Sequence, residues 1–284
     1  MKLLSYYEGA QIRYGAEVGD GVVDLTSRLG QKYAGVRTLL EAGAVAEASL
    51  AVAGAAPDRP LKGLKFALPI PDAGKIMCAG RNYRAYHEVI EDGSAPKYPS
   101  IFGRFLSSFS AHGEDILKPK ISDQLDYEGE LVAVIGKRAR HVSQADALSY
   151  VGGYTVMNEG TVRDWGKMGT QNLPSKNFHR AGSIGPWMVT ADEIADPMKL
   201  HITTKRNGQV VQDGGTDLMI FDVKYLIAHI SQFTWLEPGD MIATGSPGGS
   251  IVESKTPHWL TAGDVVEVDV SSVGTLGNKV ADEA

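Results

Sequence analysis

Single glycines separate short runs of β-branched and aliphatic residues along most of this chain. Two examples are VGDGVVDL at residues 18–25 and EPGDMIATGSPGG at residues 237–249. Glycine occupies 33 of the 284 positions, whereas average usage would give roughly 20. Glycines at this spacing favour tight turns between short strands over a flexible linker. We therefore expect a β-rich fold of the α+β or mostly-β class.

The first 70 residues have the pattern of a small α+β unit. Short strands are expected within residues 2–9 and 12–26, and residues 36–55 have helical character. Proline-containing joints at 56–63 and 68–75 then separate this unit from the rest of the chain. We predict a small N-terminal domain over residues 1–70 and a larger domain over residues 71–284.

The larger domain begins with a strand that runs into a turn, in KIMCAGRNY at residues 75–83. Its clearest helix covers residues 222–236, where an apolar stripe is formed by Val223, Leu226, Ile227, Ile230 and Phe233. Further strands are expected at Leu131–Ile135, Gly153–Met157, Trp187–Val189, His201–Arg206, Met241–Thr244 and Val265–Val270.

Composition excludes several classes of function. The net charge is −6 and the basic residues are scattered, so nucleic acid is not an expected partner. No apolar run approaches the length needed to cross a membrane. Cys78 is the only cysteine, which rules out an intrachain disulfide and favours a reducing compartment. We expect a cytoplasmic protein.

The stretch LDYEGELVAVIG, residues 125–136, combines a buried strand with acidic residues. Leu131–Ile135 is an unbroken apolar run, as in strands buried on both faces. Asp126, Glu128 and Glu130 precede it at every second position, so in a strand all three point to one side. Such carboxylates can converge on a hard divalent cation. The alternative is that they are solvated at a strand end or paired with an arginine.

Four further stretches carry candidate residues, each with an ordinary structural alternative. Glu159 ends the strand-like segment YTVMNE and could supply a third oxygen ligand, or lie in a loop beside a surface Arg163–Asp164 pair. In an expected short helix, His87 and Glu91 would share a face and could form a general base, or a surface pair. Lys176 could stabilise an oxyanion, or simply be solvated in its loop. The turn at Thr244 could bind an anion, or be a plain tight turn.

Several well-known motifs are absent. The chain has no G-x-S-x-G elbow, no P-loop, no G-x-G-x-x-G and no H-E-x-x-H. Serine hydrolases, nucleotide-binding enzymes and zinc proteases of those kinds are therefore disfavoured.

Six motifs in order resemble the fumarylacetoacetate hydrolase family, in particular its bacterial acylpyruvase-like branch. They are GRNYRAYH, IFGRFLSSF, LDYEGELVAVIG, YTVMNEGTVRDW, SKNFHRAGSIGPWMVTADEI and GDMIATGSPGG with the later LTAGDVVEVDVSSVGTLGNKV. The resemblance covers about residues 70 to 280, and residues 1–70 are similar to the variable N-terminal domain of many members. It implies a large domain of rolled, mixed β-sheets with short helices, and a homodimer.

The resemblance also implies a site. Mg²⁺ or Mn²⁺ would be held by Glu128, Glu130 and Glu159, while Asp126 would support a ligand or face solvent. His87 would be the base that activates water, with Glu91 as its partner and Glu88 as a rival. Lys176 would stabilise charge. The residues implied to contact substrate are Arg81, Tyr83, Arg104 and Thr244.

Four positions depart from the pattern of the family. Glu159 stands where Asp is usual, Gly166 where Gln is usual, and His179 where Asp is usual. The spacing from Asn82 to His87 is one residue longer than in N-Y-x-x-H. These departures affect the pocket more than the fold.

The leading functional hypothesis is a metal-dependent hydrolase. It would cleave a C–C bond in an acylpyruvate or 2,4-dioxo acid, such as maleylpyruvate, fumarylpyruvate or a 2,4-diketo-3-deoxy sugar acid, to pyruvate and a second acid. The alternative is an isomerase, decarboxylase or hydratase of 2-oxo-dienoates or oxaloacetate with the same metal site. A non-catalytic protein that keeps only the fold is disfavoured, because His87, Lys176 and the carboxylates are all present.

Overall fold

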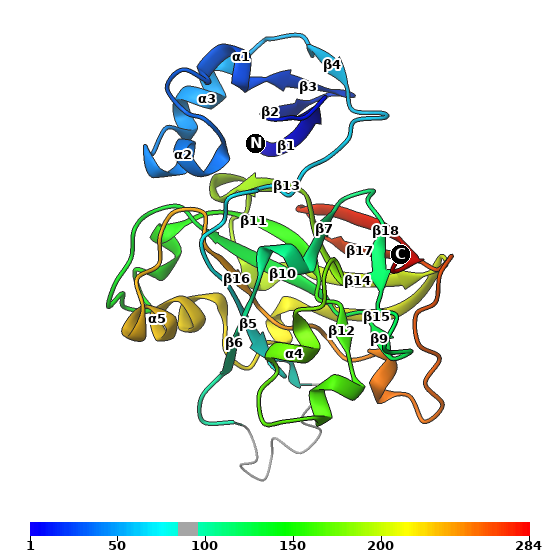
Figure 1. The fold of residues 1–284 in the computed structure, drawn as a ribbon. Helices are drawn as coiled ribbons and strands as arrows, with labels where there is room; N and C mark the ends of the chain where they lie inside the picture. Colours follow the sequence, from blue (N-terminus) through cyan, green and yellow to red (C-terminus); the bar gives the residue numbers. More distant parts are fainter. Residues whose placement is uncertain (85–95) are drawn as a thin grey trace.

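The computed structural model describes residues 1–84 and 96–284. Strands predominate in it, as Figure 1 shows, which confirms the expected sheet-dominated fold class. The helices are α1 Leu25–Leu29, α2 Val36–Glu41, α3 Val45–Val52, α4 Leu173–Lys176 and α5 Val223–Phe233. The strands are β1 Lys2–Glu8, β2 Gln11–Val18, β3 Gly21–Asp24, β4 Arg59–Pro60, β5 Ile76–Gly80, β6 Ser100–Arg104, β7 Phe109–Ala111, β8 Ile116–Lys118, β9 Leu125–Asp126, β10 Gly129–Ile135, β11 Val151–Asn158, β12 Thr161–Val162, β13 Gly182–Thr190, β14 His201–Arg206, β15 Gln209–Gly215, β16 Met241–Ala243, β17 Val265–Val270 and β18 Gly274–Asp282.

Two mixed sheets form the framework. The larger sheet has the order β4-β3-β2-β1-β13-β11-β10-β16-β5-β6, with β7 also paired to β13. In it β10 is antiparallel to β11 and β16, whereas β16 is parallel to β5. The second sheet has the order β15-β14-β17-β18-β8. Parallel and antiparallel pairs occur in both sheets, as the resemblance implied.

Strand β10 lies at the centre of the molecule and is buried on both faces. Leu131, Ala133 and Ile135 contribute to the largest hydrophobic core, which also contains residues of β14, β17 and β18. Val132 and Val134 contribute to a second core on the opposite face. The alternation follows from the two-residue period of a strand, and it confirms the expectation from the apolar run.

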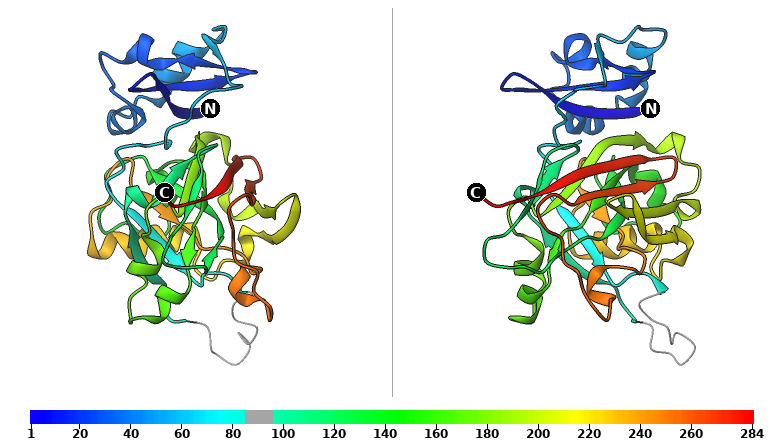
Figure 2. Two further views of the ribbon diagram at one scale, coloured as in Figure 1. Left: turned by 45° about the vertical axis from the view of Figure 1, so that its right-hand side comes forward. Right: turned by 90° about the vertical axis from the view of Figure 1, so that its right-hand side faces the viewer.

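The elements of the first 60 residues form a layer of their own, visible at the top of Figure 1 and in both views of Figure 2. This layer is joined to the rest through β1, which pairs with β13 at Lys2–Val189 and Leu3–Met188. It also shares a core with the larger part, because Leu3 and Leu39 belong to the same hydrophobic cluster as Val132. The domain boundary at residue 70 stays a prediction.

The helices differ from expectation at two places. The helical stretch expected over 36–55 is divided into α2 and α3, because Gly43 between them adopts a φ of +63°. Helix α5 is present, and four of its five stripe residues are buried, but Phe233 at its end is 57% exposed. Among the described residues, no helix has the length and apolar character needed to cross a membrane.

The cysteine lies in the interior of the larger sheet. Cys78 is in the middle of β5, opposite Ala243 of β16 and Phe102 of β6, and its side chain is fully buried. Burial raises the pKa of its thiol well above the ordinary value, and the nearby carboxylates of Glu159 and Glu130 act in the same direction.

Candidate active site

A cavity of about 490 Å³ opens at the ends of the central strands of the larger sheet. Glu128, Glu130, Glu159 and Lys176 all contribute to its wall. The remaining lining residues are Ala79, Gly80, Arg81, Phe102, Thr161, Arg163, Gly166, Lys167, Asn172, Ser175, Gly245, Ser246, Ser250, Val252 and Glu253.

The pairing of β10 with β11 explains why the acidic residues meet. Gly129, the first residue of β10, lies opposite Asn158, the last residue of β11. Glu128 and Glu159 are therefore neighbours, and the Glu159 N–H donates to the Glu128 carbonyl at 2.7 Å. The Glu128 N–H in turn donates to Asn158 Oδ1 at 3.1 Å. A local antiparallel register thus brings together two residues that are 31 positions apart.

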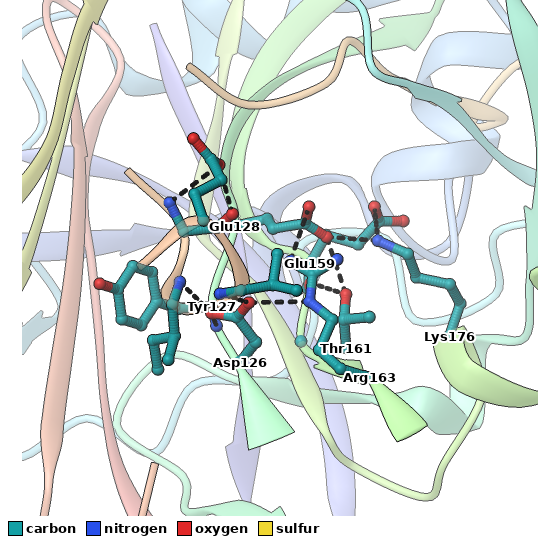
Figure 3. A network of polar contacts seen from close by, with 12 residues as sticks. Asp126, Tyr127, Glu128, Glu159, Thr161, Arg163 and Lys176 are labelled. Carbon is teal, nitrogen blue, oxygen red and sulfur yellow. Dashed lines mark hydrogen bonds and ion pairs between the residues drawn. The ribbon is translucent and has the colours of Figure 1, made fainter. Parts of the chain in front are cut away.

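Lys176, the last residue of α4, places its ammonium group between two of the carboxylates. Its Nζ donates to Glu159 Oε2 at 2.6 Å and also to Glu128 Oε2. Burial would lower the pKa of Lys176, but the charges of Glu128 and Glu159 outweigh this and raise it. The lysine is therefore held as a buried cation, and Figure 3 shows it reaching the two carboxylates.

Arg163 binds both Asp126 and Glu128 and so links the two carboxylates. Arg163 Nε donates to Asp126 Oδ2 at 2.7 Å, and its Nη2 lies 3.1 Å from Glu128 Oε1. Thr161 Oγ1 donates to Glu128 Oε2 at 2.7 Å. Burial would raise the pKa of Glu128, but the charges of Arg163 and Lys176 outweigh it and lower the pKa to about 2. Glu128 is therefore ionised, as part of the connected network in Figure 3.

Asp126 differs from the expectation that three acids share one side of a single strand. It belongs to β9, which ends at Asp126 and pairs with β12 instead of continuing into β10. Its carboxylate is completely buried and accepts from the backbone N–H groups of Ile251 and Val252 at 2.9 and 3.1 Å. A solvent-facing Asp126 is therefore wrong, and its role is to anchor the loop at 250–253.

Glu130 is a buried carboxyl group in the wall of the cavity. The Gly245 N–H donates to Glu130 Oε2 at 2.9 Å. Burial, together with the charges of Glu159 and Glu128, raises the pKa of Glu130 well above its ordinary value. The charge of Lys176 acts in the opposite direction on the pKa of Glu130 but does not outweigh these effects.

The donor chemistry of the cavity fits a hard divalent cation. Glu159 Oε1 is buried and has no hydrogen-bond partner, although Arg104 lies 3.8 Å away. Carboxylate oxygens are the ligands that Mg²⁺ and Mn²⁺ prefer. Among the described residues, no three acidic, His or Cys side chains are gathered in the arrangement of a formed metal site, so Glu128, Glu130 and Glu159 would have to draw together around an ion. The Lys176 ammonium lies between Glu128 and Glu159, where it satisfies part of their demand for positive charge.

The residues expected to contact substrate are distributed unevenly. Arg81 lines the cavity, with a φ of +54° directly after β5. Thr244, Tyr83 and Arg104 do not belong to its lining. The Thr244 hydroxyl donates to the Leu131 carbonyl at 2.9 Å instead.

Tyr83 and Arg104 are both buried outside the cavity lining, and their contact with a substrate stays a prediction. Tyr83 is 0% exposed and lies opposite Met219 in an isolated bridge. Arg104 lies behind Glu159, where it donates to the Gly160 carbonyl at 3.2 Å and stacks over Phe109. His179 is exposed and is not part of the cavity lining.

His87 and Glu91, with the rival Glu88, lie outside the described residues. The predicted general base therefore stays a prediction.

Arg163 is a site residue that the sequence analysis named only in an alternative, as half of a surface pair with Asp164. In the structure it bonds Asp126 and Glu128. Asp164 instead accepts from Ser122 Oγ at 2.7 Å. The signal lay in the three acids of residues 126–130, which need more positive charge than Lys176 alone supplies.

Comparisons with known proteins agree with this fold. Residues 75–281 match the family model described as the C-terminal domain of fumarylacetoacetate (FAA) hydrolase. The rat (Rattus norvegicus) mitochondrial oxaloacetate tautomerase Fahd2a is 37% identical over 266 residues, covering 93% of this chain and 85% of that protein.

Solved structures extend the similarity to the whole chain. Fumarylacetoacetate hydrolase from psychrophilic Exiguobacterium antarcticum superposes with a TM-score of 0.88 at 30% identity, covering 100% of both chains. Maleylpyruvate hydrolase from Sphingobium sp. SYK-6, in complex with manganese(II) and pyruvate, gives 0.84 at 25% identity, again over 100% of both. The protein described here therefore belongs to the fumarylacetoacetate hydrolase family.

Proposed function

We propose that this protein is a divalent-metal-dependent enzyme that converts a small 2-oxo diacid through its enolate, most simply by keto–enol tautomerisation of oxaloacetate. The observation that carries the proposal is the buried Lys176 ammonium beside Glu128, Glu130 and Glu159 in one cavity. The similarity to an oxaloacetate tautomerase over 93% of the chain supports this substrate.

Glu128, Glu130 and Glu159 would hold Mg²⁺ or Mn²⁺. When bound, such an ion polarises the carbonyl group of a 2-oxo acid and stabilises negative charge on its oxygen. Two observations support a cation here: Glu159 Oε1 has no hydrogen-bond partner, and the pKa of Glu130 is raised by burial and by the neighbouring carboxylates.

The protein's own groups would orient the substrate and handle charge. Lys176 Nζ is protonated and buried, so it would donate a hydrogen bond to an oxygen on which enolate charge develops. Arg81 at the cavity wall would attract a substrate carboxylate. His87 with Glu91 is the proposed base, which in a tautomerase would move a proton at the carbon next to the carbonyl.

The second candidate is hydrolysis of the C–C bond of an acylpyruvate, the leading hypothesis from sequence. Similarity to a maleylpyruvate hydrolase supports it, at lower identity than to the tautomerase. Both reactions use an enolate of a 2-oxo acid, and they differ in whether water attacks a second carbonyl.

One assay separates the two. Metal-stripped protein is given enol oxaloacetate and a panel of acylpyruvates, with and without Mn²⁺, and is compared with Glu128→Gln and with the control Glu267→Gln on β17, outside the cavity lining. We expect Mn²⁺-dependent loss of the enol absorbance, reduced roughly 10²–10³-fold in Glu128→Gln and unchanged in Glu267→Gln.

Pyruvate release from an acylpyruvate without tautomerase activity would favour the hydrolase. Activity on oxaloacetate that is independent of metal and of Glu128 would contradict the proposed site.

A further inference from the structure

Gln212 on β15 is a buried amide that joins two segments of the cavity wall without lining the cavity. Its side chain is 1% exposed. Its Oε1 accepts from the Gly129 N–H at 2.9 Å, and its Nε2 donates to the Pro247 carbonyl at 2.7 Å. The Thr204 hydroxyl also donates to Oε1, at 2.9 Å. Both ends of the amide are thus satisfied by named partners.

A β-bulge directs Gln212 toward these partners. The register between β14 and β15 shifts after the pair Thr204–Gln212, which leaves Val211 as an extra residue. Bulges commonly redirect a side chain next to an active site.

The loop at 244–250 packs directly on this bulge. Gly249 has a φ of +104°, and a Cβ there would lie 2.2 Å from the Val211 carbonyl oxygen. A Cβ on Gly214 of β15 would lie 2.8 Å from Pro247 Cβ. The separation between β15 and the loop is therefore limited by close contacts on both sides of Gln212, one with a backbone oxygen and one with a proline ring.

Both partners of Gln212 lie in segments that carry or bind Glu130. Gly129 precedes Glu130 in the chain, so the bond to its N–H fixes the backbone from which the carboxylate projects. The loop that carries Pro247 also carries Gly245, whose N–H donates to Glu130 Oε2 at 2.9 Å. One amide therefore sets the position of Glu130 and of the group that binds it.

We propose that Gln212 is a positioning residue that sets the affinity of the cavity for its divalent cation. This inference rests on the proposed cation site and adds a residue to it. Gln212 acts by holding residues 129–130 and 244–247 at a fixed separation. An amide is suited to this, because it offers one acceptor and one donor at opposite sides of a planar group.

Two variants and a control test the inference. Gln212→Met keeps the length of the side chain but removes both hydrogen-bonding groups, and Gln212→Asn keeps the amide but is one methylene shorter. The control is Asn278→Leu, because Asn278 is also a buried amide, whose Nδ2 donates to the Ala111 and Glu114 carbonyls outside the cavity.

The affinity of metal-stripped protein for Mn²⁺ is measured by titration calorimetry, and stability by thermal unfolding. We expect Gln212→Met to bind Mn²⁺ about 10–100-fold more weakly, the range seen when groups that orient metal ligands are removed. Gln212→Asn should weaken binding in the same direction, and it replaces Gln212→Met if that variant does not fold. Asn278→Leu should lose stability and keep its affinity.

Two results would overturn the inference in distinguishable ways. Unchanged Mn²⁺ affinity in both Gln212 variants, with reduced stability, would make the amide purely structural. Absence of Mn²⁺ binding by the unaltered protein would remove the proposed cation site itself, and this inference with it.

Discussion

At the scale of single residues, the buried charges of this protein occur in connected sets. Lys176 forms ion pairs with Glu128 and Glu159, and Arg163 forms ion pairs with Asp126 and Glu128. Removing one member of a buried ion pair leaves the other without compensation, which costs about 3–5 kcal/mol. The residues of the site are therefore also stability determinants, and metal binding and folding should be linked.

Lys176→Met should show this link. Without the ammonium group, the metal-free variant should lose about 3–5 kcal/mol of unfolding free energy. Saturating Mn²⁺ should raise its melting temperature more than that of the unaltered protein, because the ion replaces the missing charge. Calorimetry with and without Mn²⁺ measures both values, and Lys199→Met, at an exposed ion pair, serves as control. Equal increases in the two proteins would contradict the link.

Asp264 provides a pH test outside the site. Burial would raise the pKa of Asp264, but bonds from Arg206 at 2.7 Å, from the Thr261 N–H and from Asn207 outweigh this and lower it. A lowered folded-state pKa means that the stabilisation is present above the unfolded value, near ~3.9. It is lost as pH falls through the folded-state pKa.

Asp264→Asn should therefore lower the unfolding free energy at pH 7 by roughly 1–3 kcal/mol. The difference from the unaltered protein should shrink below about pH 4. Urea unfolding at a series of pH values measures it. A difference that stays constant down to pH 3 would show that the charge of Asp264 is not the cause.

At the scale of elements, the site depends on where strands end. Glu159 follows β11 and is succeeded by Gly160, whose position leaves no room for a side chain. A Cβ on Gly160 would lie 1.7 Å from the Ala181 carbonyl oxygen and 3.0 Å from the Gly182 nitrogen. Since both are backbone atoms, the turn that aims Glu159 requires glycine.

Gly160→Ala should destabilise the protein by more than about 3 kcal/mol, because relief of the clash requires β13 to move. Gly169→Ala is a suitable control, since a Cβ there meets nothing within 4 Å. Thermal unfolding of the two variants provides the comparison. Similar melting temperatures for both would mean that the turn at Gly160 adapts.

Sequence patterns predicted the strands and acidic residues of the site better than the pairing and contacts between segments far apart in the chain. The apolar run identified β10, and the order of the motifs identified Glu128, Glu130 and Glu159, which do share a cavity. Asp126 does not belong to the same strand as the residues of β10, and this was not predictable. Its strand, β9, pairs with β12, in which the partner of Asp126 lies 35 residues further along the chain. Residues whose partners are remote in sequence, such as Arg104, leave no local pattern to recognise.

At the scale of the whole molecule, the N-terminal layer and the catalytic part share one sheet. Only two residue pairs connect β1 to β13, but the hydrophobic core continues across the junction. Interfaces of this kind leave exposed apolar surface and an unpaired strand edge when one side is removed.

Homodimer formation and a cytoplasmic location stay predictions, the first of which light scattering would test.

Removal of residues 1–70 should therefore give an aggregating protein. The deletion uncovers the edge of β13 together with its core residues Ile184 and Met188. Analytical ultracentrifugation of the shortened and full chains measures the effect. A monodisperse fragment with unaltered Mn²⁺ affinity would instead establish residues 71–284 as an independent folding unit.

The interior position of Cys78 has a practical consequence. Its thiol is protonated and inaccessible in the folded protein, so alkylating reagents should not modify it there. Modification requires an opening of the hydrophobic cluster that Cys78 shares with Ile76 and Ala243, in strands beside the acidic wall. The rate of alkylation would therefore report how often this cluster opens, and its slowing by Mn²⁺ or a bound 2-oxo acid would report ligand binding with no other label on the protein.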